Sequence, residues 1–291
     1  MEKNIFDNQE LLELFAKTGD AHNEDSASAR TAFAASLALP LRKEIEKNNI
    51  ARTLFWVDEL TADAQPVYEL DIKPISAYVL PRIGSAPQNI VGVEDINVST
   101  FEVTSSIEWK LQLARQKRIN IVQRKALSLK NAITDLENKA AWELIRGAVQ
   151  DSRTVESTAT KLTKTVYNEG FQMMQSMDEY NPDVILLNAK RAGDVRDWGS
   201  VDLDPTTQRE IWKKAGLGNI WGADIIIWNE LPDDEVWYFD TSKLGVMPVR
   251  TKFVTYDDPT AIPKYRQRIL GYEEIGLAVF DTNAIVKVEL S

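Results

Sequence analysis

The feature that most constrains how this sequence can fold is one long amphipathic helix between residues 119 and 144. No proline occurs between Gln88 and Asn181, and Gly147 is a suitable C-terminal stop. At 1.5 Å per residue the helix is roughly 39 Å long, so it spans most of a domain. Its apolar side chains recur every three or four residues and therefore share one face: Ile119, Val122, Ala126, Leu129, Ile133, Leu136, Ala140 and Leu144.

The composition limits the chemistry that this chain can perform. It has 291 residues, a net charge of -10, no cysteine and one histidine. The lack of cysteine excludes disulfides, thiolate nucleophiles and cysteine-bound zinc. His22 lies in the polar stretch "GDAHNEDSASAR", so we interpret it as a solvated side chain. The acidic balance disfavours a broad nucleic-acid surface. Without a signal peptide or a membrane-length apolar run, we expect a soluble protein made in the cytosol.

Three glycines in "AGLGNIWGADIIIWNELP" raise the question of a phosphate-binding loop. A dinucleotide fingerprint needs the spacing G-x-G-x-x-G between a strand and a following helix. Here Gly216, Gly218 and Gly222 are spaced one residue too widely, and the predicted order is helix, glycines, strand. We interpret them as a helix stop at Gly216 and a turn before a buried strand that starts near Ala223.

The stretch "DLDPTTQREIWK" resembles the start of a calcium-binding loop at Asp202 and Asp204. Such a loop needs glycine at its sixth position and glutamate at its twelfth. Thr207 and Lys213 occupy those positions, so an exposed turn is the better interpretation.

Other charged clusters also favour structural roles. Asp233–Glu235 reads as a solvated turn. Glu273 and Glu274 are neighbours in a predicted strand, so they point to opposite faces and cannot share a site. The five basic residues of "RQKRINIVQRK" favour a solvated or intersubunit face, because no aromatic residues are interleaved for base stacking. We predict no catalytic, cofactor-binding or metal-binding residues.

The order of the elements predicts an α+β fold with an interrupted domain. Residues 1 to about 50 read as a polar helical arm with little core, interrupted at Pro40. "RTLFWVDEL" and "VYELDI" read as a hairpin, and "INVSTFEVTSSIEW" as a long strand with a phase shift. A mixed α/β unit follows the long helix, and its tryptophans read as core or as a subunit contact. The two C-terminal strands are expected to pair with the strand before the long helix.

This order resembles the major capsid protein of tailed phages, the Hong Kong 97-type fold. "RTLFWVDELTADAQPVYELDI" resembles its extended E-loop, and "INVSTFEVTSSIEW" with the long helix resembles its P-domain. "NPDVILLNAKRAGDVRDW" and "IWGADIIIWNELPDDEVWYFDTSKLGVMPVR" resemble its A-domain, and "YRQRILGYEEIGLAVFDTNAIVKVELS" its closing strands. The implied division is a 1–51 N-terminal arm, a 52–98 E-loop hairpin, a 99–159 first P-domain part, a 160–248 A-domain and 249–291 closing strands.

The resemblance implies a structural protein of the virion, not an enzyme. It would self-assemble as pentamers and hexamers into an icosahedral shell around double-stranded DNA, with E-loops and arms lapping over neighbouring subunits. A hairpin that cannot bury both faces, and an apolar arm, also call for neighbours. The implied partners are further copies, a separate scaffolding protein (favoured by an encoded Met1), a portal and a cement protein, with weak contact to DNA. Assembly is expected in the host cytoplasm.

Some relatives bond an E-loop lysine to an asparagine of the next subunit. Lys73 is the one lysine between Lys47 and Lys110 and hence the one E-loop candidate, and Asn283 in the closing turn is a candidate acceptor. An ordinary surface lysine is the simpler interpretation. Two alternatives to a phage capsid stay open: an encapsulin-like cage of the same fold, and a soluble α/β enzyme that uses carboxylates. The enzyme would need a cleft with converging acids and a perturbed pKa.

Overall fold

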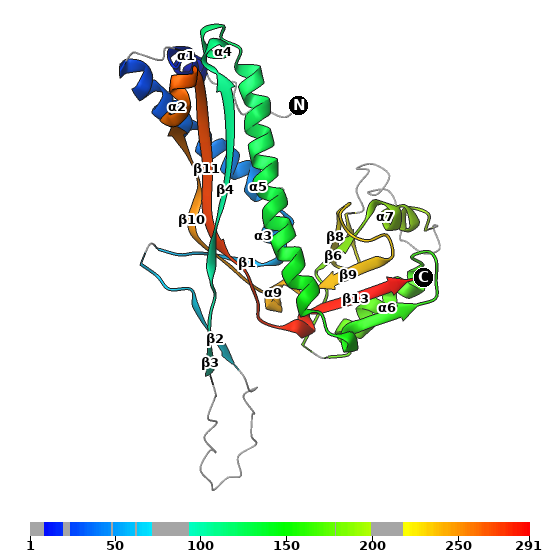
Figure 1. Cartoon of the computed structure of the whole chain (residues 1–291). Coiled ribbons are helices and arrows are strands. Elements are labelled where there is room, and N and C mark those ends of the chain that lie inside the picture. The colour runs from blue at the N-terminus through cyan, green and yellow to red at the C-terminus, as the bar shows by residue number, and fades with distance from the viewer. Residues whose placement is uncertain are drawn as a thin grey trace.

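The structure is a computed structural model that describes residues 9–19, 24–47, 49–61, 63–71, 93–177, 179–198 and 218–291. The described part is elongated (Figure 1). Long strands run beside helix α5, a compact lobe lies beside the C-terminal end of that helix, and a narrow two-stranded ribbon extends away from the strands. Helices and strands mix throughout, so the predicted α+β class is confirmed.

The strands beside α5 form one sheet, which we call the long sheet. Its order is β1-β10-β11-β4, with β12 also paired to β10. Strands β11 and β4 are antiparallel over their full length, from Arg266 opposite Lys110 to Gly276 opposite Thr100. This pairing confirms that the strand before the long helix joins a strand near the C-terminus. The bounds are β1 Trp56–Glu59, β4 Thr100–Lys110, β10 Gly245–Asp258, β11 Arg266–Gly276 and β12 Ala278–Val279.

Helices α2 (Glu24–Lys47) and α5 (Ile119–Ala148) cover one face of the long sheet. On β11 the odd-numbered side chains from 267 to 275 are buried and the even-numbered ones face the other way, as the two-residue period of a strand requires. The Thr255 hydroxyl donates to the Ala34 carbonyl at 2.6 Å, and Arg42 Nη2 donates to the Phe253 carbonyl at 2.9 Å. Three short α-helices and one 3-10 helix also belong to this part of the molecule: α1 Gln9–Lys17, α3 Ile50–Leu54, α4 Leu111–Arg115 and η2 Pro259–Lys264.

One glycine marks how closely α5 approaches the sheet. A Cβ atom at Gly271 would lie 2.8 Å from Cε2 of Phe253 on β10 and 3.2 Å from Cδ2 of Leu129 on α5. Any larger residue would have to push these two core side chains apart. Gly271 therefore sets the spacing between β11 and the helix layer.

The lobe is built on a second sheet, the lobe sheet, in the order β5-β13-β9-β6-β8-β7. Tyr167, Phe171, Tyr238 and Val286 belong to its separate core, whereas Trp237 is buried in the main core. The predicted mixed α/β unit and the core interpretation of Trp237 are thereby confirmed. The bounds are η1 Asp151–Arg153, β5 Thr154–Ser157, α6 Lys164–Gln175, β6 Val184–Leu187, α7 Ala189–Arg196, β7 Asn219–Ile220, β8 Ala223–Ile227, β9 Glu235–Phe239, α9 Thr241–Leu244, η3 Thr282–Ala284 and β13 Ile285–Leu290.

The third sheet is the ribbon, which consists of β2 (Val67–Asp71) and β3 (Val93–Asn97) alone. Strand β3 is followed by β4 after two residues, so the predicted phase shift falls at the break between two strands. The expected hairpin between "RTLFWVDEL" and "VYELDI" is wrong. Residues 50–54 form α3, β1 runs parallel to β10, and β2 pairs with β3. Each partner is distant in sequence, which local strand patterns cannot reveal.

The expectation of an arm with little core is wrong for residues 24–47. Helix α2 continues through Pro40. Phe33, Leu37, Leu41 and Ile45 are fully buried in the main core. These residues are four apart, so they line one side of a helix whose other positions are mostly small or polar. Burial of this side outweighs the backbone hydrogen bond that Pro40 removes.

The last strand also departs from expectation. Residues 285–290 pair with β9 and β5 of the lobe sheet rather than with β4. The chain therefore leaves the long sheet after β12 and returns to the lobe. Strand β13 carries buried Val286 and Val288 on the face toward the lobe core, so the lobe needs this strand to complete its sheet.

The long helix is confirmed, but its buried face is not the predicted one throughout. The first five stripe residues, Ile119 to Ile133, are buried, whereas Leu136 is 45% exposed. Beyond residue 133 the buried face passes through Thr134, Glu137, Asn138, Ala141 and Ile145. The helix also continues one residue past Gly147. A carboxylate occupies a core position here because it has charged partners on neighbouring elements.

Candidate functional site

Gly222, the last of the three glycines, lies in a tight turn of the lobe. Strands β7 and β8 pair with Trp221 and Gly222 as the two-residue loop, and both have positive φ (54° and 91°). The Gly222 N–H donates to Oδ1 of Asn219 at 3.0 Å. Strand β8 begins at Ala223, as predicted, and no helix follows to bind phosphate. The predicted turn is confirmed, whereas the predicted helix stop at Gly216 lies outside the described residues and stays a prediction.

Trp221 is the unusual member of this turn, because bulky residues rarely adopt the left-handed conformation. Its ring centroid lies 5.3 Å from that of Tyr167 and 5.7 Å from that of Phe171. These ring contacts offset the backbone cost, and 44% of Trp221 remains exposed. The turn thus places an aromatic side chain partly at the lobe surface.

The neighbouring glutamates of β11 lie on opposite faces, as predicted. Glu274 faces outward, where it accepts from the Thr100 hydroxyl at 2.7 Å and lies 3.3 Å from Nη1 of Arg250. Asp233 is also exposed and lies 3.6 Å from Nζ of Lys190. Several other candidate residues lie outside the described residues: His22, Lys73, Asp202, Asp204, Thr207, Trp212, Lys213 and Gly216.

Glu273 faces inward and belongs to a charged cluster that sequence reasoning missed. Arg52 Nη2 lies 2.6 Å from Glu137 Oε1 and 3.1 Å from Glu273 Oε2. Both glutamate side chains are fully buried. Asn49 donates its side-chain N–H to Glu137, and the Asn138 side chain accepts from the Ala51 N–H at 3.1 Å. The cluster therefore joins α3, α5 and β11.

This cluster holds two carboxyl groups against one guanidinium group. Burial raises the pKa of Glu273 to about 9, and the negative charge of Glu137 acts in the same direction. At neutral pH, Glu273 is therefore protonated and Glu137 forms the ion pair with Arg52. The one available sequence signal was the position of Glu137, four residues from both Ile133 and Ala141 on the same helix face.

An enzyme that uses carboxylates would need converging acids with a perturbed pKa in a cleft. The cluster has the converging acids, and the pKa of Glu273 is raised. It lacks the cleft, because both glutamate side chains are fully buried and neither reaches solvent. Within the described ranges, no group of three or more metal-ligating side chains comes together. No helix in the same ranges has the length and hydropathy to cross a membrane. The buried charges hold three elements together.

Asn283 lies in the short helix η3, at the junction of the lobe and the long sheet. Its N–H donates to Oδ1 of Asp281 at 2.8 Å, and its carbonyl accepts from Arg153. The predicted turn is confirmed. Both backbone polar groups of Asn283 form hydrogen bonds within the same chain. Because Lys73 lies outside the described residues, bonding between Lys73 and Asn283 stays a prediction.

Two surfaces of the described chain are not covered by other elements of the same chain. The ribbon has no second layer among the described elements, although Tyr68 anchors its base through a 2.7 Å hydrogen bond to Asp58 and a ring contact with Phe280. On the uncovered face of the long sheet, Tyr256 is 54% exposed beside Leu270, its cross-strand partner. These surfaces suit contacts with other proteins.

A charged network borders this uncovered face. Glu108 Oε1 lies 2.6 Å from Nη1 of Arg266, and Glu108 Oε2 lies 3.0 Å from Nη2 of Arg268. Hydrogen bonds from Arg266 and then Arg268 lower the pKa of the Glu108 carboxyl. The Glu108 carboxylate therefore pairs with two guanidinium groups, and the three side chains give the face a fixed polar edge.

Several solved structures share the fold of most of this chain. A chain from Microbacterium phage Oxtober96 matches with a TM-score of 0.61 at 12% identity, covering 84% of this chain and 91% of that one. A chain from Mycobacterium phage Bobi gives 0.59 at 12% identity, with 84% and 90% covered. A chain from the capsid of an empty GTA particle gives 0.59 at 15%, with 82% and 89% covered. No curated protein matches by sequence.

The fold is therefore that of tailed-phage capsid proteins, the Hong Kong 97 type. The family model described as "Phage capsid protein" matches residues 93–288, which is well over half of the sequence. The chain belongs to this family, and its place is the capsid of a phage particle.

Proposed function

We propose that many copies of this chain assemble into the closed icosahedral shell that surrounds a phage genome. The observation that carries the proposal is the ribbon. It is a two-stranded element without a covering layer among the described elements, and two strands alone are marginally stable in water. A neighbouring copy in a shell would supply the missing layer. Membership in the phage capsid family favours this role over an encapsulin-like cage.

We also propose which part of the chain corresponds to each domain of the Hong Kong 97-type fold. The ribbon and the segment between its strands correspond to the E-loop, the long sheet with α2 and α5 to the P-domain, and the lobe to the A-domain. Strands β5 and β13 go with the lobe, because they complete its sheet. Lobes would meet around capsomer axes as pentamers and hexamers, where the partly exposed Trp221 would be available for contact.

We also propose that the protein acts without catalysis. Its converging acids support a structural role, since Glu137 and Glu273 are sealed inside the fold. The further partners that we propose are a separate scaffolding protein, a portal and a cement protein. Their support is the resemblance to tailed-phage capsids alone.

Expression of the full chain with and without a scaffolding partner tests the proposal. Electron microscopy of the purified material should show shells or rings of capsomers. A protein that stays monomeric under both conditions and at every concentration examined would refute the shell-building role.

A further inference from the structure

The end of the molecule where α4 meets α5 carries a concentration of positive charge. Between residues 109 and 134 the sequence has seven basic residues and no acidic one, although the whole chain has a net charge of -10. Lys110 and Arg115 from this segment, and Lys264 from the turn before β11, are exposed. In the described part of the chain, none of these three forms a salt bridge with a carboxylate. A local region of positive charge on an acidic molecule attracts anions.

These three side chains line one cavity of about 630 Å³. The lining has a fourth basic residue, Arg266, and no acidic one. Arg266 lies 2.6 Å from Glu108, so its charge is partly offset, whereas the charges of the other three are not. Gln112 and Gln116 also line the cavity, and their amide groups can donate hydrogen bonds to the oxygens of an anion. The cavity therefore suits a ligand that carries phosphate groups.

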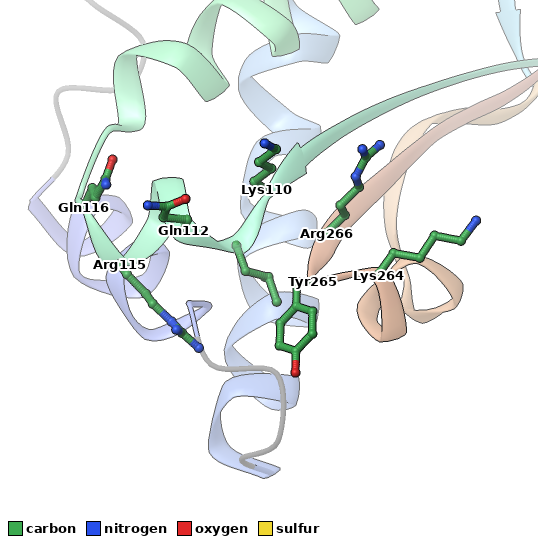
Figure 2. A pocket seen from close by; sticks show the side chains of 8 residues that line it. Lys110, Gln112, Arg115, Gln116, Lys264, Tyr265 and Arg266 are labelled. Atoms are coloured by element: carbon green, nitrogen blue, oxygen red, sulfur yellow. The ribbon is translucent and has the colours of Figure 1, made fainter.

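One aromatic side chain lies among these basic groups. Residues 115–125 contain no aromatic residue, but the fold brings Tyr265 to the same cavity, flanked in sequence by Lys264 and Arg266. Tyr265 is 60% exposed. Figure 2 shows the basic side chains of the lining projecting in different directions around its ring. Basic groups that diverge in this manner do not enclose one small anion, but they suit an extended chain with a phosphate at every link.

The chain holds Tyr265 and Arg115 in defined positions. The Leu111 N–H donates to the Tyr265 carbonyl at 3.0 Å, and Nε of Arg115 donates to the Gly19 carbonyl at 2.7 Å. Tyr265 has a φ of 54°, and so has Lys117 in the turn after α4. This conformation costs energy for any residue with a large side chain. Strained residues gather at ligand sites, and groups that are already fixed lose little entropy on binding.

We propose that this end of the molecule binds single-stranded nucleic acid. The exposed ring of Tyr265 stacks on an unpaired base, while the basic side chains around it contact the phosphates of the same strand. A duplex is a poorer ligand, because its bases are already paired and stacked on one another. The acidic balance of the whole chain repels phosphates elsewhere and confines binding to this end. The site goes beyond the shell-building function proposed above and does not depend on it.

Fluorescence anisotropy with the purified full chain tests the stacking contact. The probe is a fluorescein-labelled thymidine oligonucleotide of about 12 nucleotides, which is within the usual size of a single-stranded site. Tyr265→Leu should weaken its binding roughly tenfold, because the base loses its stacking partner. Tyr265→Phe keeps a ring and should bind within about twofold of wild type. Tyr256→Leu is the matched control, since Tyr256 is 54% exposed and does not line the cavity. This control should bind like wild type.

The same probe tests the phosphate contacts through the dependence of binding on salt. The charge variant combines Lys110→Gln with Lys264→Gln and should bind more weakly than wild type. The slope of its log affinity against log salt should be shallower by about 1.4, because two phosphate contacts are lost. A control with Arg146→Gln and Lys161→Gln changes the net charge equally at exposed sites outside the cavity, and it should keep the wild-type slope. Thermal melting checks that every variant folds.

Several outcomes would overturn the inference. A duplex of the same length that binds as tightly as the single strand would assign the site to the phosphate backbone alone. Displacement of the probe by inorganic pyrophosphate or by polyglutamate, as readily as by the unlabelled oligonucleotide, would reduce the site to one for any anion. Full binding by Tyr265→Leu, equal losses in either control, or no binding by wild type would also contradict it. Electron microscopy of the same preparations reports shell formation separately, so a failure of the proposed function is distinguishable.

Discussion

At the scale of single residues, the protonation of Glu273 makes a prediction about stability and pH. Its pKa is about 9 in the folded chain, against 4.5 for an ordinary glutamate. Between these values the folded state holds a proton that the unfolded state has lost, so stability falls as pH rises from 4.5 to 9. Glu273→Gln removes this titration. We expect the variant to gain roughly 1–3 kcal/mol over wild type at pH 7.

The measurement is denaturant unfolding of the unassembled chain at pH 4, 7 and 9. The advantage of Glu273→Gln should be small at pH 4 and grow toward pH 9. An advantage, or a loss, of equal size at all three pH values would mean that Glu273 is not the titrating group. Arg52→Met is the contrasting change, because it leaves the Glu137 carboxylate buried without a charge partner and should cost about 3–5 kcal/mol.

A second prediction at this scale concerns the turn at Gly222. The positive φ of 91° strains any residue with a side chain, most of all a β-branched one, although the space around a Cβ at this position is open. Gly222→Val should therefore cost about 1–2 kcal/mol. Thermal melting checks this loss. Gly193→Ala, in open space within helix α7, is the matched control and should be neutral or stabilising. An unchanged melting temperature for Gly222→Val would show that the turn tolerates the strain.

At the scale of elements, helix α2 is part of the core and not a detachable arm. Leu37 is fully buried and Leu39 is 56% exposed in the same helix. Leu37→Ala should lower the free energy of unfolding by about 2–5 kcal/mol, since it opens a cavity beneath the long sheet. Leu39→Ala should change it by less than about 0.5 kcal/mol. Urea unfolding measures both variants. If both lose similarly little free energy of unfolding, α2 is an arm and not part of the core.

The elements that could be predicted from sequence are those whose pattern is local. The long helix was predictable from its apolar spacing as far as Ile133, and the turn at Gly222 from its glycine and flanking strand. Strand partners were harder. The pairing of β1 with β10 joins residues almost 200 positions apart, and only the assembled sheet determines it.

The buried cluster of Arg52, Glu137 and Glu273 could not be predicted either, because its members are also distant in sequence. Glu137 reads as a surface residue unless Arg52 and Glu273 are known to face it, and these three residues come from three separate segments. The same holds for the uncovered surfaces. The sequence indicated a solvated or intersubunit face at residues 115–125, but the place of that face relative to the ribbon follows from the fold.

At the scale of the whole molecule, the account describes one copy as an incomplete unit. Its core is closed, since the long sheet and the lobe sheet each have a packed interior. Its surface is not, since the ribbon and the outer face of the long sheet each lack a partner layer within the described chain. Such a molecule is expected to be stable as a folded chain and to associate with copies of itself.

The most direct test of this claim is the mass of the particles that the purified full chain forms, measured by light scattering and imaged by electron microscopy. The chain has a mass of 32.9 kDa. We predict closed shells in the megadalton range, alone or with a scaffolding partner. A single species of 32.9 kDa that persists at every concentration and with that partner present would contradict the account.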